Sequence, residues 1–170
     1  MEIAVLELEE FQTEDIMSHN HAKITYRLTK ILSQHDILPK SEFELAHGWA
    51  KPDVAICKPN KINWLRDIIR PTHPPLIAIE ILSPRQALTD LTNKWLDVYF
   101  PSDVKTVWVI IPKFKQITVL TASSQENVNS GVIHDETTGI SLDLSKLLRN
   151  KFYSVRKLII GLATATFIAW

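Results

Sequence analysis

The hydrophobic pattern of the chain centres on an apolar run of strand length that contains one acid, Glu80. The run reads Pro75-Leu76-Ile77-Ala78-Ile79-Glu80-Ile81-Leu82-Ser83-Pro84. Because side chains alternate along a strand, we expect Glu80 on the opposite face from Ile77, Ile79 and Ile81. Ser83 and Pro84 are typical of a helix cap and a first helical residue. The pattern predicts a buried strand that carries Glu80 near its carboxyl end and then turns into a helix.

Helical spacing of apolar residues predicts two helices. The first covers residues 20–34, with Asn20 as its cap, and the second covers residues 84–100. The second helix has an apolar stripe formed by Leu88, Leu91, Trp95 and Val98. Between the two helices, residues 58–75 are bounded by prolines, and two helical turns are predicted within residues 63–70.

Shorter apolar segments predict the remaining strands. Residues 43–45 and 51–57 are predicted to pair as a hairpin, with Asp53 at the start of the second strand. Residues 104–111 are apolar on both faces, as in a central strand, and residues 116–121 alternate like a paired neighbour. A polar loop is expected at 123–131, and a weaker strand after it. The order of elements predicts an α/β fold, a mixed β-sheet with helices on its faces.

Composition favours one globular domain in a reducing compartment. The chain has 170 residues and 45% hydrophobic content, which is enough for one core. Its single cysteine, Cys57, excludes an intrachain disulfide framework, and its first residues lack the basic segment of a secretory signal. We therefore predict a cytoplasmic protein, with a domain at residues 1–148 and a basic and apolar C-terminal extension at residues 149–170.

The end of the chain, residues 158–170, carries no charge and follows Arg156 and Lys157. This stretch is shorter than the roughly 20 residues that a helical membrane span requires. We predict a packed terminal helix and no membrane span, with a short membrane-associating tail as the alternative.

Asp53 and Glu80 are the strongest candidates for chemistry, because each acid lies in or beside an apolar strand. If the strands are neighbours, the two carboxylates converge, and their repulsion favours a cation between them. Mg²⁺ is often held by one or two carboxylates together with waters and a substrate phosphate. The alternative interpretation is two acids at strand ends whose oxygens accept backbone N–H groups.

A wider set of motifs surrounds these acids: His21-x-x-Ile24, Pro52-Asp53-Val54, Ile79-Glu80-Ile81-Leu82-Ser83-Pro84, Asp90-x-x-x-Lys94, Tyr99 and Val107-Trp108-Val109-Ile110-Ile111-Pro112. Together they resemble the Uma-type restriction endonucleases, a family within the PD-(D/E)xK nuclease superfamily, over residues 18–148. The resemblance implies a restriction-endonuclease-like core and hydrolysis of DNA phosphodiester bonds with Mg²⁺ or Mn²⁺. It also implies a homodimer.

Under this resemblance, Asp53 and Glu80 bind the metal and Lys94 completes the catalytic set. The superfamily lysine normally stands two residues after the second acid, a position that Leu82 occupies here. Lys94, one helical turn after Asp90, matches the family's lysine in the following helix. The competing interpretation is an exposed Asp90–Lys94 ion pair that stabilises the helix by roughly 0.3–0.5 kcal/mol.

Other residues are candidates for supporting roles. Glu44 and Asp90 are additional carboxylate candidates. Nucleic-acid contacts are predicted for basic residues on either side of the central strand, although the net charge is zero: Lys58, Lys61, Arg66 and Arg85.

Aromatic and histidine side chains provide few further candidates for functional residues. Trp64, in the basic segment, is a candidate for stacking on a base. His19 and His21 are interpreted as capping or surface residues rather than metal ligands.

Two functions compete at this point. The first is a metal-dependent DNA endonuclease, which the presence of Asp53, Glu80 and Lys94 together favours. The second is a catalytically inactive nuclease-fold module that binds nucleic acid or protein, which the zero net charge and Leu82 favour. The two interpretations differ in whether the three residues converge.

Overall fold

The structure of the protein is a computed structural model that describes residues 17–84 and 86–148. Its helical elements are α2 (His19–Ile31), α3 (Leu88–Lys94), the π-helical turn η1 (Trp95–Tyr99), the 3-10 turn η2 (Pro112–Phe114) and α4 (Leu144–Leu147). Its strands are β1 (Asp36–Pro39), β2 (Phe43–Leu45), β3 (Gly48–Ala50), β4 (Val54–Cys57), β5 (Ile77–Ile81), β6 (Thr106–Ile111), β7 (Gln116–Leu120), β8 (Gln125–Val128), β9 (Val132–His134) and β10 (Ser141–Asp143).

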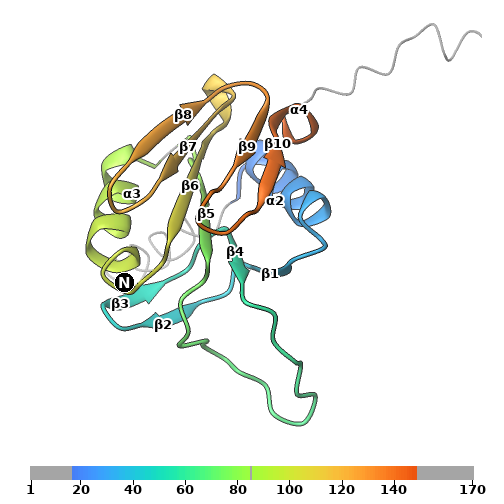
Figure 1. The fold of residues 1–170 in the computed structure, drawn as a ribbon, viewed down its shortest axis with the longest axis vertical. Helices are drawn as coiled ribbons and strands as arrows, with labels where there is room; N and C mark the ends of the chain where they lie inside the picture. The colour runs from blue at the N-terminus through green and yellow to red at the C-terminus, as the bar shows by residue number, and fades with distance from the viewer. Residues whose placement is uncertain (1–16, 85, 149–170) are drawn as a thin grey trace, which may run out of the picture.

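Six of these strands form one mixed sheet in the order β1-β4-β5-β6-β7-β8 (Figure 1). Strands β5 and β6 run parallel, and the other neighbouring pairs in this sheet are antiparallel. A parallel pair needs a crossover connection, and here α3 and η1 provide it. The sheet places β5, the predicted central strand, between β4 and β6. The predicted α/β fold, a mixed sheet flanked by helices, is confirmed.

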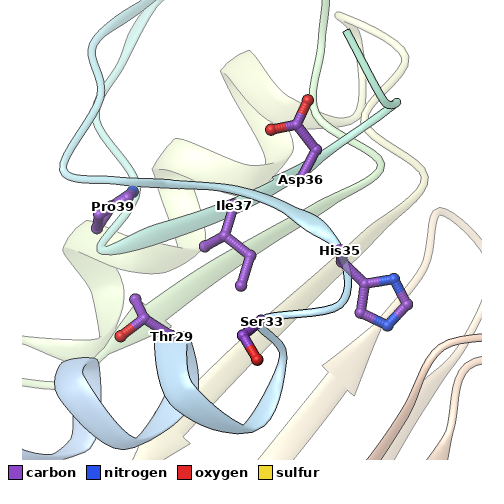
Figure 2. Close-up of a pocket in the computed structure, with 6 residues that line it drawn as sticks. All are labelled: Thr29, Ser33, His35, Asp36, Ile37 and Pro39. Atoms are coloured by element: carbon purple, nitrogen blue, oxygen red, sulfur yellow. The ribbon is translucent and has the colours of Figure 1, made fainter.

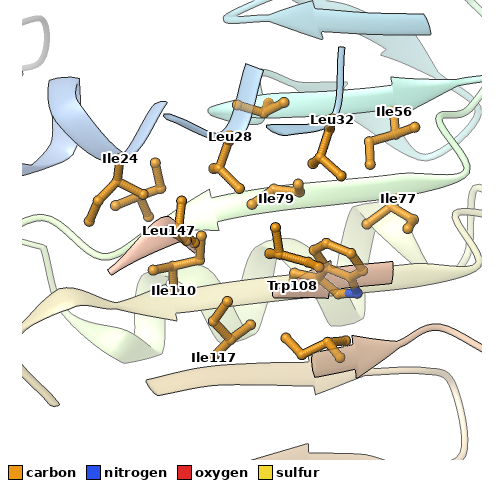
Figure 3. Close-up of a cluster of buried hydrophobic side chains, with 14 of the residues drawn as sticks. Ile24, Leu28, Leu32, Ile56, Ile77, Ile79, Trp108, Ile110, Ile117 and Leu147 are labelled. Atoms are coloured by element: carbon orange, nitrogen blue, oxygen red, sulfur yellow. The ribbon is translucent and has the colours of Figure 1, made fainter. Parts of the chain in front are cut away.

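One face of the sheet packs against α2, α4 and the β9–β10 hairpin (Figure 3). Helix α2 contributes the core residues Ile24 and Leu28, and Leu32, which caps its C-terminal end, continues the same helical spacing. They belong to one buried cluster with the isoleucines of β5 and with Trp108 of β6, which is fully buried. Removal of this apolar surface from water is the main force that holds α2 on the sheet.

The opposite face is covered by α3, η1 and the separate β2–β3 hairpin. Phe43 and Leu45 from the hairpin pack in one cluster with Leu91 of α3 and with Ala78 of β5. Because Ala78 lies in this cluster and the isoleucines of β5 lie in the first, the predicted alternation of the central strand is confirmed.

The strand predictions are wrong at three places. Residues 43–45 pair with β3 rather than with residues 51–57, whereas β4 joins the main sheet between β1 and β5. Strand β1 was not predicted, because four residues give too little periodicity. Strand β8, predicted as a polar loop, forms the far edge of the sheet with largely exposed side chains.

The predicted helix boundaries also need correction. Ser18, rather than Asn20, caps α2 by accepting the backbone N–H of His21. Helix α3 begins at Leu88, so Ser83 and Pro84 do not start it. Residues 63–70 form turns instead of a helix, since they bury no apolar face and an unsupported short helix is marginal in water.

The described residues do not cover every prediction. Arg85 and the extension at 149–170 lie outside them. Within residues 17–84 and 86–148, no helix combines the length and the apolar character that a membrane crossing would need.

We predict that Leu28→Ala lowers the free energy of unfolding by about 2–5 kcal/mol, because it leaves a cavity where a fully buried side chain stood. Urea denaturation measures the change. Ile69→Ala is the control: its side chain is 87% exposed, and we expect a change within about 0.5 kcal/mol. Equal effects of the two substitutions would contradict the described position of α2.

Cys57 gives a chemical test of the β1–β4 register. Its partner in β1 is Asp36. Burial, and to a smaller extent the charge of Asp36, raise the pKa of the Cys57 thiol from 9.0 to about 11. Because the thiolate is the reactive form, we expect alkylation at pH 8 about 100-fold slower than for an exposed cysteine. Iodoacetamide labelling followed by mass spectrometry measures the rate, and Asp36→Asn should increase it modestly. Fast labelling of the folded chain would argue against this pairing.

Candidate active site

Asp53 and Glu80 lie side by side where β4 begins and β5 ends. Val54 is the register partner of Ile79 in this antiparallel pair, so Asp53 comes opposite Glu80 at the next position. Each of the two acids is only 5% exposed. Oδ2 of Asp53 accepts the backbone N–H of Ile81 at 2.6 Å, which joins the two strands at this point. The structure therefore brings the two predicted acids together.

Two basic side chains contact Asp53. The Nζ atom of Lys40 donates to Oδ1, and Nε2 of His21 lies 2.9 Å from Oδ2, close but poorly aligned for a hydrogen bond. Burial on its own raises the pKa of Asp53, but the contacts with His21 and Lys40 and the N–H of Ile81 hold it below its ordinary value. Asp53 is therefore an ionised carboxylate at neutral pH.

Lys94 and Tyr99 contact Glu80 through the same oxygen. Nζ of Lys94 lies 2.6 Å from Oε1 and also donates to the backbone carbonyl of Lys51 at 3.2 Å. The hydroxyl of Tyr99 donates to Oε1 at 2.5 Å. Burial and the nearby charge of Asp53 raise the pKa of Glu80, and they outweigh the opposite effect of Lys94 and Tyr99. The two acids thus differ in the direction of their pKa shifts.

The π-helical turn η1 explains how Lys94 and Tyr99, five residues apart, reach one oxygen. In a regular α-helix, five steps of about 100° leave two side chains roughly 140° apart. Here the N–H of Phe100 donates to the carbonyl of Trp95 at 3.0 Å, a hydrogen bond across five residues. This wider turn brings residues five apart closer to one face, and π-turns of this kind are frequent at functional sites.

The donor set at this position fits a hard divalent cation. Within the described ranges, no three acids, histidines or cysteines are grouped as a metal site. Mg²⁺, however, is often bound by only one or two carboxylates, with waters and substrate phosphates as its other ligands. Two adjacent buried carboxylates meet that requirement, and both already attract the positive charge of a lysine.

A family model described as "Putative restriction endonuclease", Uma2, matches residues 9–150 of the chain. The chain belongs to the Uma2 family. Among solved structures, its fold is similar to that of a putative nuclease belonging to DUF820 from Anabaena variabilis, with a TM-score of 0.62 and 16% identity. The similarity covers 77% of this chain and 81% of that chain. At this level of identity, it shows that the two chains share a fold. No curated protein shows a match.

Lys94 lies at the end of α3, the helix that follows β5. Its partner is Glu80, so the competing interpretation of an exposed pair with Asp90 is wrong. Asp90 instead accepts the backbone N–H of Ala87 at 3.2 Å, at the start of α3. Glu44 is exposed on the β2–β3 hairpin opposite Trp49, so it is not part of the buried carboxylate pair.

The predicted nucleic-acid contacts lie at the other end of β4. Lys58, Lys61 and Arg66 are exposed in the segment that follows this strand, whereas Asp53 precedes it. Four strand residues separate the two ends by about 13 Å. The segment extends away from the sheet (Figure 1), so these residues do not surround Asp53.

Two partners of Asp53 were missed in the sequence. The interpretation of His21 as a capping or surface residue is wrong, because its side chain is buried. A signal was present, since His21, Ile24 and Leu28 share one face of α2 at helical spacing. Lys40 had no local signal: it comes opposite Asp53 only because Pro39 pairs with Val54 in β1 and β4.

A surface hollow of about 450 Å³ lies beside the edge strand β1 (Figure 2). Its lining consists of Thr29, Ser33, His35, Asp36, Ile37 and Pro39, and includes neither Asp53 nor Glu80. The carboxylate of Asp36 accepts the backbone N–H of Asn60 at 3.0 Å. This hollow is therefore distinct from the candidate active site.

We predict that Tyr99→Phe destabilises the protein by about 1–3 kcal/mol, because a buried carboxylate oxygen loses a hydrogen-bond donor. Chemical denaturation of the two proteins measures the difference. Tyr26→Phe removes a hydroxyl from a residue that is 66% exposed and serves as the matched control. If both substitutions had the same small effect, the contact between Tyr99 and Glu80 would not be stabilising.

Proposed function

We propose that this Uma2-family chain is an endonuclease that hydrolyses phosphodiester bonds of DNA, with Mg²⁺ or Mn²⁺ held by Asp53 and Glu80. One observation carries the proposal: Lys94, from the helix after β5, lies 2.6 Å from Glu80, and Glu80 is adjacent to Asp53. An acid pair that can hold a divalent cation, with a lysine beside it, provides groups that can stabilise the charge developing in phosphodiester hydrolysis. The family description and the solved nuclease of similar fold support the same reaction class.

Each residue has a distinct role in this proposal. A bound divalent cation lowers the pKa of a water molecule and neutralises charge on the phosphate. Asp53, ionised at neutral pH, and Glu80 provide its carboxylate ligands. Lys94 orients the attacking water or stabilises the negative charge that develops as water adds to phosphorus and the P–O bond breaks. Tyr99 holds the Glu80 carboxylate in place.

The basic segment after β4 is proposed to contact the DNA backbone. Lys58, Lys61 and Arg66 are exposed, and about 13 Å along β4 corresponds to roughly four base pairs of duplex DNA. These residues are therefore proposed to bind phosphates several base pairs from the bond that is cleaved. Trp64, which is 88% exposed in the same segment, is proposed to contact a base.

The alternative is a catalytically inactive nuclease-fold module that binds nucleic acid or protein. The internal pairing of both carboxylates with lysines favours it, since the charges of the two acids are balanced by the chain itself. The lack of a lysine at position 82 favours it as well. Metal binding and DNA nicking by the same samples separate the two functions.

We predict that the wild-type protein nicks supercoiled plasmid DNA when Mg²⁺ or Mn²⁺ is present, and that Glu80→Gln loses both nicking and calorimetric metal binding. Lys94→Met should keep metal binding but lose about 10²–10³-fold in cleavage rate, because it lacks a group that acts on the reacting atoms. Gel electrophoresis of the plasmid and isothermal titration calorimetry are the measurements.

Lys105→Met is the control for the loss of a lysine. Lys105 forms an exposed pair with Asp103, so its removal should leave nicking and metal binding unchanged. Metal binding without nicking in the wild type, under conditions where the protein is folded, would favour the inactive module. If the wild type bound no metal, the proposed metal-dependent reaction would be rejected.

A further inference from the structure

Lys40 is a charged residue that contacts Asp53 and that the proposed reaction does not use. It follows β1, whose register with β4 places it next to Asp53. Two contacts join these residues: the backbone N–H of Lys40 donates to the carbonyl of Asp53 at 3.2 Å, and its Nζ donates to Oδ1. Lys40 is therefore held to Asp53 by both main chain and side chain.

The backbone of Lys40 is unusual for a residue with a side chain. Its φ angle is +53°, in the left-handed region that glycine adopts most easily. Such a conformation persists only where the surrounding structure holds it. Here the β1–β4 pairing and the hydrogen bond to the Asp53 carbonyl provide that support.

The two oxygens of Asp53 have different partners. Oδ2 accepts the N–H of Ile81 and lies beside His21, both of which belong to buried parts of the fold. Oδ1 is held by Lys40, whose side chain is 38% exposed while that of Asp53 is 7% exposed. Lys40 can therefore leave Asp53 for water without disturbing the core, whereas Ile81 cannot.

We propose that Lys40 is a built-in counter-ion: it occupies the cation position on Oδ1 of Asp53 in the metal-free chain and must leave before a divalent cation binds there. This inference rests on the proposed function, since it assumes that Asp53 is a metal ligand. Lys40 thus limits the affinity for metal by reducing the fraction of chains in which Oδ1 is available. It is a positioning residue rather than a catalytic one.

The test is metal affinity in the absence of DNA. If the available fraction is 1–10%, Lys40→Met should bind Mn²⁺ about 10- to 100-fold more tightly than wild type in calorimetry. Lys40→Gly removes the same ammonium group, suits the positive φ angle and should show the same gain even if Lys40→Met folds poorly. The rise in melting temperature on addition of Mn²⁺ should also be larger for both variants than for wild type.

Lys51→Met controls for the general loss of a positive charge near the site. Lys51 is two residues from Asp53, but its side chain is exposed and it is the backbone carbonyl that contacts Lys94. Its substitution should change Mn²⁺ affinity by less than about twofold, as expected for an exposed charge at physiological salt. A gain equal to that of Lys40→Met would overturn the inference, because charge alone would then explain it.

The remaining outcomes separate this inference from the proposed function. If wild type binds Mn²⁺ and both Lys40 variants bind equally or more weakly, the counter-ion role is wrong and the metal site remains. Binding by the variants but not by wild type would support the counter-ion role of Lys40, while it would reject the metal-dependent reaction proposed for the wild-type chain. If neither wild type nor any variant binds Mn²⁺, both the inference and the metal-dependent reaction are rejected.

Discussion

The burial of two adjacent carboxylates is the constraint on which the arrangement of this fold depends. Asp53 and Glu80 are buried opposite each other where β4 begins and β5 ends. Two like charges at this separation are costly unless positive groups accompany them. Lys40 from the end of β1 and Lys94 from α3 supply the positive charge. His21 from α2 and the hydroxyl of Tyr99 from η1 also contact the two acids. Apolar packing holds the layers together, and the contacts of this cluster join the elements around β4 and β5 to the two acids.

The two acids have almost the same exposure, yet their surroundings shift their pKa values in opposite directions. Asp53 accepts a backbone N–H as well as basic side chains, and its pKa is lowered. Glu80 has Lys94 and Tyr99 on one oxygen, and burial together with the charge of Asp53 raises its pKa. A pair of acids in which one pKa is lowered and the other is raised is typical of sites that perform chemistry.

Sequence patterns predict those parts of the site whose residues belong to one strand or to the helix that follows it. The central strand, the position of Glu80 within it and the following helix with Lys94 all come from residues close together in the chain. The neighbour relation of Asp53 and Glu80 does not follow in this way, because the predicted partner of residues 51–57 was the segment 43–45, whereas the structure pairs β4 with β1 and β5. Nor does the position of Lys40, because its place opposite Asp53 depends on the pairing of β1, a four-residue strand without a clear pattern. His21 is intermediate: its spacing from Ile24 indicates an inward side chain, but not which acid it meets.

The π-helical turn and the five-residue spacing of Lys94 and Tyr99 depend on each other. Most surface helices tolerate a residue gained or lost near their ends, since the helix only lengthens or shortens. Here the deletion of one residue from 95–98 would allow a regular α-helix to form, with a gain in local hydrogen-bond geometry. The same deletion would leave the lysine and the tyrosine four residues apart, about 40° from each other around a regular α-helix. During divergence, the loss of one residue from this segment would therefore keep both side chains on one face, because the regular helix then does what the π-helical turn does here.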